Sequence, residues 1–123
     1  MNGGQYYWMA RALRMIQPVE DILLDGEISK GKADSPKARV RFFRHPEGTV
    51  LFVADYGTER VDLKLSEKVA TDCEVMDLDT EQRVASIGPT NGAFTVTLDE
   101  DRVRLLFIGT KDQWQKVRAR RSH

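Results

Sequence analysis

Cysteine and histidine are scarce in this sequence, with one cysteine and two histidines among 123 residues. The single Cys73 excludes an internal disulfide bond and a zinc site built from several cysteines. We expect it to be a buried structural thiol, because no basic cluster lies near it in sequence to lower its pKa. His45 stands beside a proline in a turn and His123 is the last residue, so neither is a good candidate for a positioned general base.

The sequence also lacks long apolar runs and an excess of charges of one sign. No stretch reaches the roughly 20 apolar residues of a membrane-spanning helix, and the first residues lack a basic segment followed by an apolar one. We therefore expect no secretory signal, no membrane partner and a cytoplasmic location. Lys and Arg total 19, as do Asp and Glu, so overall charge gives no reason to expect nucleic acid as a partner.

The N-terminal part, residues 1–24, has the pattern of a helix and a connector. Residues 6–16 contain neither proline nor glycine, and Met9, Leu13 and Ile16 share one helical stripe. Pro18 is a suitable stop, because the residue before a proline avoids the helical conformation. Residues 25–37 are rich in helix and strand breakers and predict a solvated loop.

Residues 38–109 alternate between short apolar segments and turn signals. Turn chemistry at His45–Gly48 and at Asn91-Gly92 separates neighbouring segments. The spacing predicts an all-β fold, a two-layer antiparallel β-sandwich of the jelly-roll or immunoglobulin-like kind, preceded by a short N-terminal α-helix. About seven strands are expected, at residues 39–43, 49–54, 60–65, 73–78, 83–87, 94–98 and 103–108.

The last segment, residues 110–123, is basic and contains Trp114. Its cations could contact phosphates while Trp114 stacks on a base. We favour a frayed cationic tail, with Trp114 covering an edge of the core.

Residues able to carry chemistry are few. No serine lies in a Gly-x-Ser-x-Gly elbow. Asp77, Asp79 and Glu81 alternate as in a calcium loop, but Gln82 stands where that loop needs its glycine. A looser calcium site there, or at residues 99–101, is the alternative to solvated turns. We expect no catalytic residue, no metal and no cofactor.

Several of these segments together resemble a known type of domain. Residues 50–56, the turn at 77–81, and the strands at 94–98 and 103–107 resemble the C-terminal β-sandwich domains that follow the catalytic barrel of many glycoside hydrolases. Residues 9–23 look like the last helix and connector that lead into such a domain. The resemblance implies an accessory domain without its barrel, so it transfers no catalytic residue to this chain.

Two functions of different classes remain open. The first is a non-catalytic module with a structural or protein-interaction role, whose partner is a carbohydrate-active catalytic domain or a second copy bound through the N-terminal helix. Its interaction surface would include Tyr6, Tyr7, Met9 and Leu13. The alternative is a carbohydrate-binding module, in which surface aromatics stack on sugar faces. Its candidate residues are Tyr56, Trp8 and Trp114.

Overall fold

The protein is a sheet-dominated sandwich with helices against one of its faces. The computed structural model describes residues 12–33 and 35–121. Residues 12–16 are helical and lead into a 3-10 helix, η1 (Gln17–Val19). The remaining elements are α2 (Glu20–Asp25), β1 (Glu27–Lys30), β2 (Ala38–His45), β3 (Gly48–Asp55), β4 (Val61–Ser66), β5 (Cys73–Asp77), β6 (Arg83–Ile87), β7 (Ala93–Leu98), β8 (Val103–Gly109) and α3 (Lys111–Arg121).

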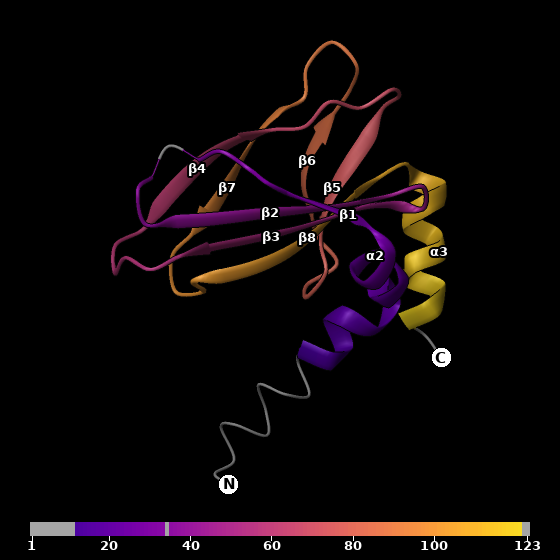
Figure 1. Cartoon of the computed structure of the whole chain (residues 1–123), viewed down its shortest axis with the longest axis horizontal. Helices are drawn as coiled ribbons and strands as arrows, with labels where there is room; N and C mark the ends of the chain where they lie inside the picture. Colours follow the sequence, from indigo (N-terminus) through magenta and orange to yellow (C-terminus); the bar gives the residue numbers. More distant parts are fainter. Residues whose placement is uncertain (1–11, 34, 122–123) are drawn as a thin grey trace, which may run out of the picture.

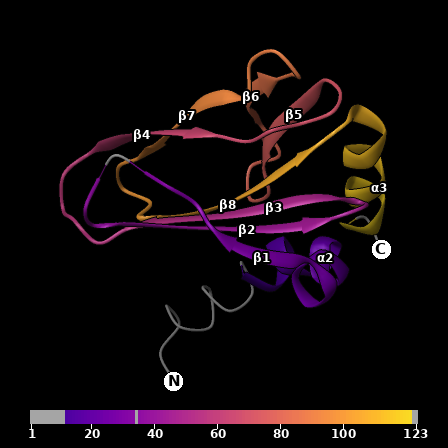
Figure 2. The same ribbon diagram turned by 45° about the horizontal axis from the view of Figure 1, so that its top comes forward.

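The strands form two antiparallel sheets. A six-stranded sheet has the order β1-β2-β3-β8-β5-β6, and β4 pairs with β7 in a second sheet. Figures 1 and 2 show the β4–β7 pair on one side of the large sheet and α2 on the other, with α3 at one end of the sheet. The predicted all-β sandwich with an N-terminal helix is therefore confirmed.

The burial pattern explains why the strands arrange themselves in this way. On β4, Leu63 and Leu65 are buried while Asp62 and Lys64 are exposed, as the alternation predicts. On β3 both faces are buried, because Leu51 faces the second sheet and Val50 lies under the helices. The large sheet therefore has one core on each face.

The core between the sheets contains residues from seven strands. Its buried members include Val40, Leu51, Leu63, Val75, Ile87, Val96 and Leu106. The second core lies between the large sheet and the helices, with buried members Val19, Ile22, Val50, Met76, Leu78, Phe107, Trp114 and Val117.

The structure expected for two segments of the chain is wrong. The segment 25–37 is not only loop, because Glu27–Lys30 forms β1 and pairs with β2 at the sheet edge, which raises the strand count to eight. The basic segment 110–123 is not a frayed tail, because Lys111–Arg121 forms α3. Its Trp114 and Val117, three residues apart, are both buried against the sheet.

Candidate interaction surface

The helices cover only part of the face on which they lie. Ile28, Phe43, Val50 and Phe107 occupy paired positions on β1, β2, β3 and β8. Val50 and Phe107 are fully buried in the core beneath the helices, which fixes the side on which this row lies. Ile28 at the β1 edge of the row is 61% exposed.

Further rows on the same side of the sheet extend beyond the helices. Lys30, Arg41, Phe52 and Leu105 are paired across β1, β2, β3 and β8, two residues along each strand, so they face the same way. Phe52 and Leu105 are half-buried. In the row after them Val103 is 51% exposed. The apolar surface therefore continues past the end of the helical cover.

Helix α2 adds an apolar residue to this surface. Ile22 is buried against the sheet, and Leu24, two residues later on the opposite side of the helix, is 73% exposed. Leu13 in the preceding helical turn is also largely exposed. We call the combined surface of α2 and the uncovered rows the helix-bearing face. Its residues are Glu20, Asp21, Leu24, Asp25, Ile28, Lys30, Arg39, Arg41, Phe52, Val103 and Leu105.

Charge on the helix-bearing face is divided by sign. Helix α2 carries Glu20, Asp21 and Asp25 and no basic residue. The guanidinium groups of Arg39 and Arg41 each donate to the backbone carbonyl of the preceding residue, at 2.9 Å. Neither arginine forms an ion pair with a carboxylate of the described residues. Both charges are therefore available to a partner.

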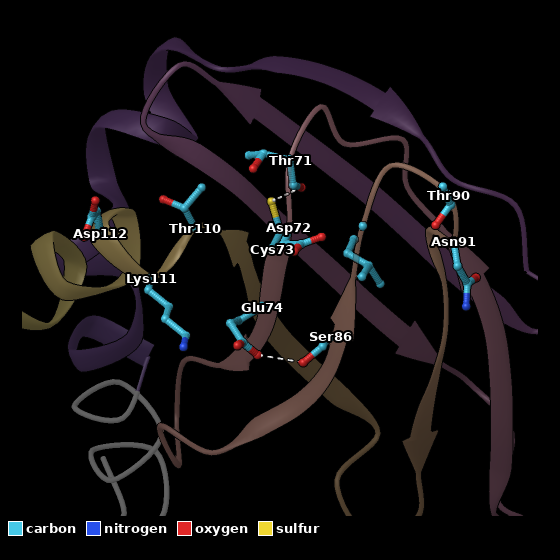
Figure 3. Close-up of a pocket in the computed structure, with 12 residues that line it drawn as sticks. Thr71, Asp72, Cys73, Glu74, Ser86, Thr90, Asn91, Thr110, Lys111 and Asp112 are labelled. Carbon is cyan, nitrogen blue, oxygen red and sulfur yellow. Dashed lines mark hydrogen bonds between the residues drawn. The ribbon is translucent and has the colours of Figure 1, made fainter.

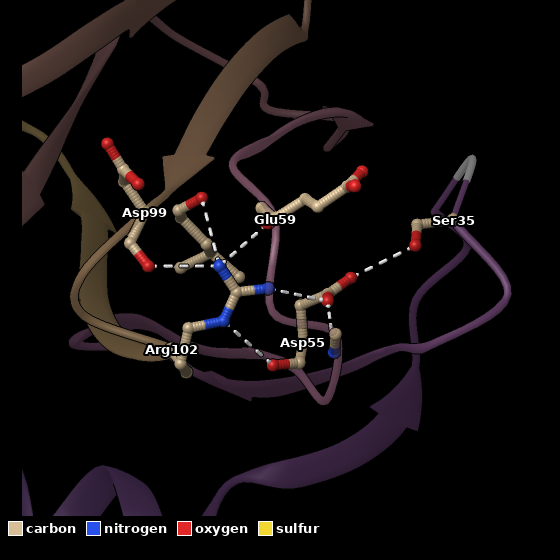
Figure 4. A network of polar contacts seen from close by, with 7 residues as sticks. Ser35, Asp55, Glu59, Asp99 and Arg102 are labelled. Atoms are coloured by element: carbon tan, nitrogen blue, oxygen red, sulfur yellow. Dashed lines mark hydrogen bonds and ion pairs between the residues drawn. The ribbon is translucent and has the colours of Figure 1, made fainter.

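The buried Asp55 belongs to a structural network at the end of β3 (Figure 4). Its carboxylate accepts hydrogen bonds from the Gly57 N–H at 2.8 Å, the Ser35 hydroxyl at 3.0 Å and Arg102 Nη2 at 2.8 Å. These bonds lower the pKa of Asp55, with the Gly57 N–H as the largest cause. Arg102 also donates to the Glu59 and Asp99 carbonyls, so the network ties two loops together.

The turn from Asp77 to Glu81 is held in a similar way. Asp77 Oδ1 accepts from the N–H groups of Asp79 and Thr80, and Asp77 Oδ2 lies 2.8 Å from Arg104 Nη2. Asp79 pairs with Arg14 at 3.2 Å. Within the described part of the chain no three His, Cys, Asp or Glu residues are grouped so as to hold a metal ion. The carboxylates of Asp77 and Asp79 therefore make contacts that stabilise the fold.

An open hollow of about 690 Å³ lies beside β5 and β6 (Figure 3). Ser86 Oγ donates to Glu74 Oε2 at 2.9 Å inside it. Burial, together with Asp72 and Glu74, raises the pKa of the half-buried Cys73 thiol, which therefore stays protonated near neutral pH. The residues that line the hollow include no aromatic ring. They are Thr71, Asp72, Cys73, Glu74, Ser86, Ile87, Gly88, Thr90, Asn91, Thr110, Lys111 and Asp112.

The structure separates the residues proposed from the sequence. Tyr56 is 71% exposed, with the Arg39 guanidinium 5.7 Å from its ring centroid. Trp114 was expected to be a stacking residue in the carbohydrate-binding alternative, and this is wrong because its ring is 7% exposed and packs on Phe107. Leu13 is exposed, as an interaction residue must be. Four candidates lie outside the described residues, namely Tyr6, Tyr7, Trp8 and Met9.

Sequence reasoning missed most of the helix-bearing face. The sequence places Leu24 in a connector, Ile28 in a loop, and Val103 and Leu105 in the last expected strand, with no indication that they share a face. The available signal was the acidic segment at Glu20–Glu27, followed by the basic segment Lys30–Arg41, which contains five Lys or Arg residues and one acid. Only the strand register shows that residues from both segments share one face.

Comparison with known proteins finds similarity in structure alone. No protein-family model and no curated protein sequence matches this chain. An α-amylase from Geobacillus thermoleovorans superposes with a TM-score of 0.57 and 14% identity, over 72% of this chain and 19% of that one. A maltogenic α-amylase from Thermotoga neapolitana gives a TM-score of 0.55 and 14% identity, over 72% of this chain and 22% of that one. An α-amylase from Anoxybacillus gives a TM-score of 0.52 and 11% identity, over 72% of this chain and 19% of that one.

These matches confirm the resemblance to glycoside hydrolases at the level of the fold. The chain spans about a fifth of the length of the solved α-amylases it matches, so most of each enzyme has no counterpart here. Across residues 12–33 and 35–121, no helix has the length and apolar character needed to cross a membrane.

Proposed function

We propose that this protein is a non-catalytic β-sandwich module that binds another polypeptide through its helix-bearing face. The observation that carries the proposal is the incomplete cover of the large sheet. Ile28 and Val103 are more than half exposed, and the half-buried Phe52 and Leu105 lie in the row between them. Several apolar side chains exposed on one face are a feature that often marks an interface.

The structural matches support an accessory role. In the α-amylases this fold accounts for about a fifth of a longer chain. We infer that the present chain likewise packs on neighbouring protein with one of its faces. In the present chain the helix-bearing face is the one with uncovered apolar rows, and the partner is either a carbohydrate-active catalytic domain or a second copy.

The buried carboxylates also support a role without catalysis. Asp55, Glu67 and Asp77 are the buried acids of the described residues, and each is bound by an arginine. Glycoside cleavage requires two carboxyl groups that face each other across a cleft open to substrate. A carboxylate held by arginine inside a packed sandwich serves structure instead.

Carboxylate labelling tests the proposed interface. Isotope-labelled chain is treated with a carbodiimide and glycinamide, either alone at low concentration or mixed into an extract of the cells that produce it. Mass spectrometry then measures the labelled fraction at each carboxylate. We expect Glu20, Asp21 and Asp25 to be labelled several-fold less in the extract, because a bound partner covers α2.

Exposed carboxylates far from α2 supply the internal control. Asp62 on β4 of the second sheet and the exposed Asp72 before β5 lie outside the helix-bearing face and are expected to react equally in both samples. Equal labelling of α2 in both samples would overturn the proposed interface. Hydrolysis of a panel of chromogenic glycosides above the buffer blank would overturn the non-catalytic assignment.

Carbohydrate binding is the alternative function, and Tyr56 is the residue that favours it. This is the exposed aromatic ring of the described residues, and single rings of this kind can stack on a sugar. Affinity electrophoresis in gels containing starch, xylan or cellulose derivatives distinguishes the two functions. The interaction module migrates unchanged in every gel, whereas retardation that Tyr56→Ala abolishes would support carbohydrate binding.

A further inference from the structure

We propose that the helix-bearing face binds the same face of a second copy, forming a twofold-symmetric dimer. The proposal rests on the proposed function, because it names the partner of that interface. Three properties of the face carry it: an apolar centre, an acidic end and a basic end. Their arrangement is complementary to itself, which is the requirement for an interface between identical faces.

The apolar centre lies where α2 meets β1. Leu24 is 73% exposed and Ile28 is 61% exposed, and the half-buried Phe52 lies one row further along the sheet. Large aliphatic and aromatic side chains of this kind form the dry core of protein interfaces, with polar residues around them.

The two charged ends lie on different elements, the acidic end on α2 and the basic end on β2. Helix α2, with Glu20 and Asp21, packs on β2 and β3. Figure 2 shows α2 beside β1, near one end of the large sheet. From Phe43, in the row under the helices, β2 runs to Arg41 and then Arg39, which lies about 13 Å from Phe43 at the usual rise of a strand. The basic end therefore begins at Arg41, about 7 Å from Phe43, and continues along β2 away from the row under the helices.

A twofold axis through the apolar centre makes both charged contacts at once. Rotation by half a turn places α2 of one copy over the Arg39 and Arg41 end of the other, and the reverse contact forms by symmetry. Leu24 and Ile28 then meet their equivalents near the axis. Complementary charge of this kind fixes the orientation in which two faces associate.

The chain's own first residues do not offer the same complementarity. Residues 1–11 contain no Asp or Glu, so they cannot neutralise Arg39 and Arg41. A second copy brings acidic and basic residues together with an apolar surface, and it therefore matches all three parts of the face.

Paired charge reversals test the dimer. The first variant is Glu20→Lys with Asp21→Lys, and the second is Arg39→Glu with Arg41→Glu. Sedimentation equilibrium over a range of concentrations should show a monomer–dimer equilibrium for the original chain. Each variant alone should be at least about tenfold weaker in self-association, because both of its charged contacts become repulsive.

Mixing the two variants gives the decisive measurement. In an equimolar mixture, the basic α2 of the first variant meets the acidic β2 end of the second. The acidic α2 of the second variant meets the unchanged Arg39 and Arg41 of the first, so both contacts are attractive. We therefore expect a heterodimer at least as tight as the original dimer, and this recovery cannot arise if the variants are simply unfolded. Association of the original chain should weaken as salt rises.

A matched control reverses two charges outside the face. Lys68→Glu with Lys111→Glu alters the loop after β4 and the start of α3, and should associate like the original chain. A monomer at every concentration, or a mixture that does not associate, would overturn the dimer. If α2 is nevertheless protected from labelling in the cell extract, the proposed function stands with a different partner; if α2 is unprotected as well, both proposals fail.

Discussion

Arg104 on β8 donates two hydrogen bonds to a single oxygen of Asp77, from Nε at 3.1 Å and from Nη2 at 2.8 Å. Its remaining nitrogen, Nη1, donates to the Thr97 carbonyl on β7 at 3.2 Å. One guanidinium therefore connects the large sheet to the β4–β7 pair. Because Asp77 is buried and also caps its own turn, strand pairing, turn geometry and sheet stacking all depend on this contact.

The first prediction concerns the charge of Asp77. Asp77→Asn keeps an oxygen able to accept from the turn N–H groups, but removes the negative charge opposite the mostly buried Arg104. An ion left without its partner in this environment is costly, so we expect a loss of about 2–3 kcal/mol in the free energy of unfolding. Urea denaturation followed by circular dichroism measures it.

An exposed ion pair provides the control for this prediction. Arg60 and Asp62 lie 3.5 Å apart with both side chains more than half exposed. Arg60→Met should change the free energy of unfolding by less than about 0.5 kcal/mol. Equal losses in the two variants would show that burial of the Arg104 contact does not matter.

Arginine contacts between the sheets occur at two further places. Arg44 on β2 donates to both oxygens of Glu67, just after β4, at 2.8 and 2.9 Å, and this hydrogen bonding raises the pKa of the guanidinium. Arg102 reaches the carboxylate of Asp55 and the Leu98 carbonyl at the end of β7. At the edges of the apolar core, the two sheets are thus joined by arginine guanidinium groups, each of which donates several hydrogen bonds.

The second prediction concerns acid stability and Asp55. The hydrogen bond from the Gly57 N–H, with those from Ser35 and Arg102, lowers the pKa of Asp55 in the folded protein. A carboxyl group with a lowered folded pKa stabilises the protein above its unfolded pKa of about 4, and this contribution disappears as pH falls through the folded value. We therefore expect the original chain to lose stability below about pH 4 more steeply than Asp55→Asn.

Urea midpoints at a series of pH values from neutral to acid test this second prediction. Asp55→Asn should be the less stable protein near pH 7, with the difference narrowing toward acid. Asp62→Asn is a suitable control because the Asp62 side chain is largely exposed. A constant difference between Asp55→Asn and the original chain across the series would contradict the argument.

The strands were predictable because apolar and polar residues alternate along them, as expected for a strand with one buried face. Leu63 and Leu65 alternate with charged residues, and Asn91-Gly92 and His45–Gly48 supply turn chemistry. Strand β1 was not predictable in the same way. It is a four-residue edge strand with one apolar side chain, Ile28, so its pairing with β2 leaves no periodic signal.

Helix α3 was missed because charge dominates its composition. Among residues 111–120, whose burial the structure describes, only Trp114 and Val117 are buried, and the surrounding Lys and Arg residues have the pattern of a solvated tail. The helix-bearing face was missed for a different reason. Leu24 and Arg39 come from separate elements, and their common side is set by tertiary packing and strand register, which local patterns do not contain.

The third prediction concerns the β2–β3 turn. Gly48 has a φ of 136°, and a Cβ there would lie 2.4 Å from the buried Phe107 ring. Gly48→Ala therefore combines backbone strain with a clash, and we expect a loss of about 3 kcal/mol in thermal or urea unfolding. Glu81, with a φ of 61°, provides the opposite case. Glu81→Gly should be neutral or stabilise by up to about 1 kcal/mol, and two losses of similar size would contradict the role of φ.

The fourth prediction tests whether α3 belongs to the folded core. The Trp114 ring lies 5.8 Å from that of Phe107, centroid to centroid, and Trp114 and Val117 are buried in the core that also contains Val19 of η1 and Ile22 of α2. Removing a buried indole loses transfer free energy and leaves a cavity, so Trp114→Ala should cost about 3–5 kcal/mol in the free energy of unfolding.

Two variants on the same helix make this fourth prediction specific. Trp114→Phe keeps an aromatic ring against Phe107 and should cost clearly less than Trp114→Ala. Gln115→Ala alters an exposed neighbour and should stay within about 0.5 kcal/mol of the original chain. A frayed basic tail would make all three substitutions equally harmless, whereas a docked helix ranks them Trp114→Ala, Trp114→Phe, Gln115→Ala in falling order of cost. Because a domain of this size is stabilised by only about 5–15 kcal/mol in total, the largest of these losses should unfold a measurable share of the protein on mild heating.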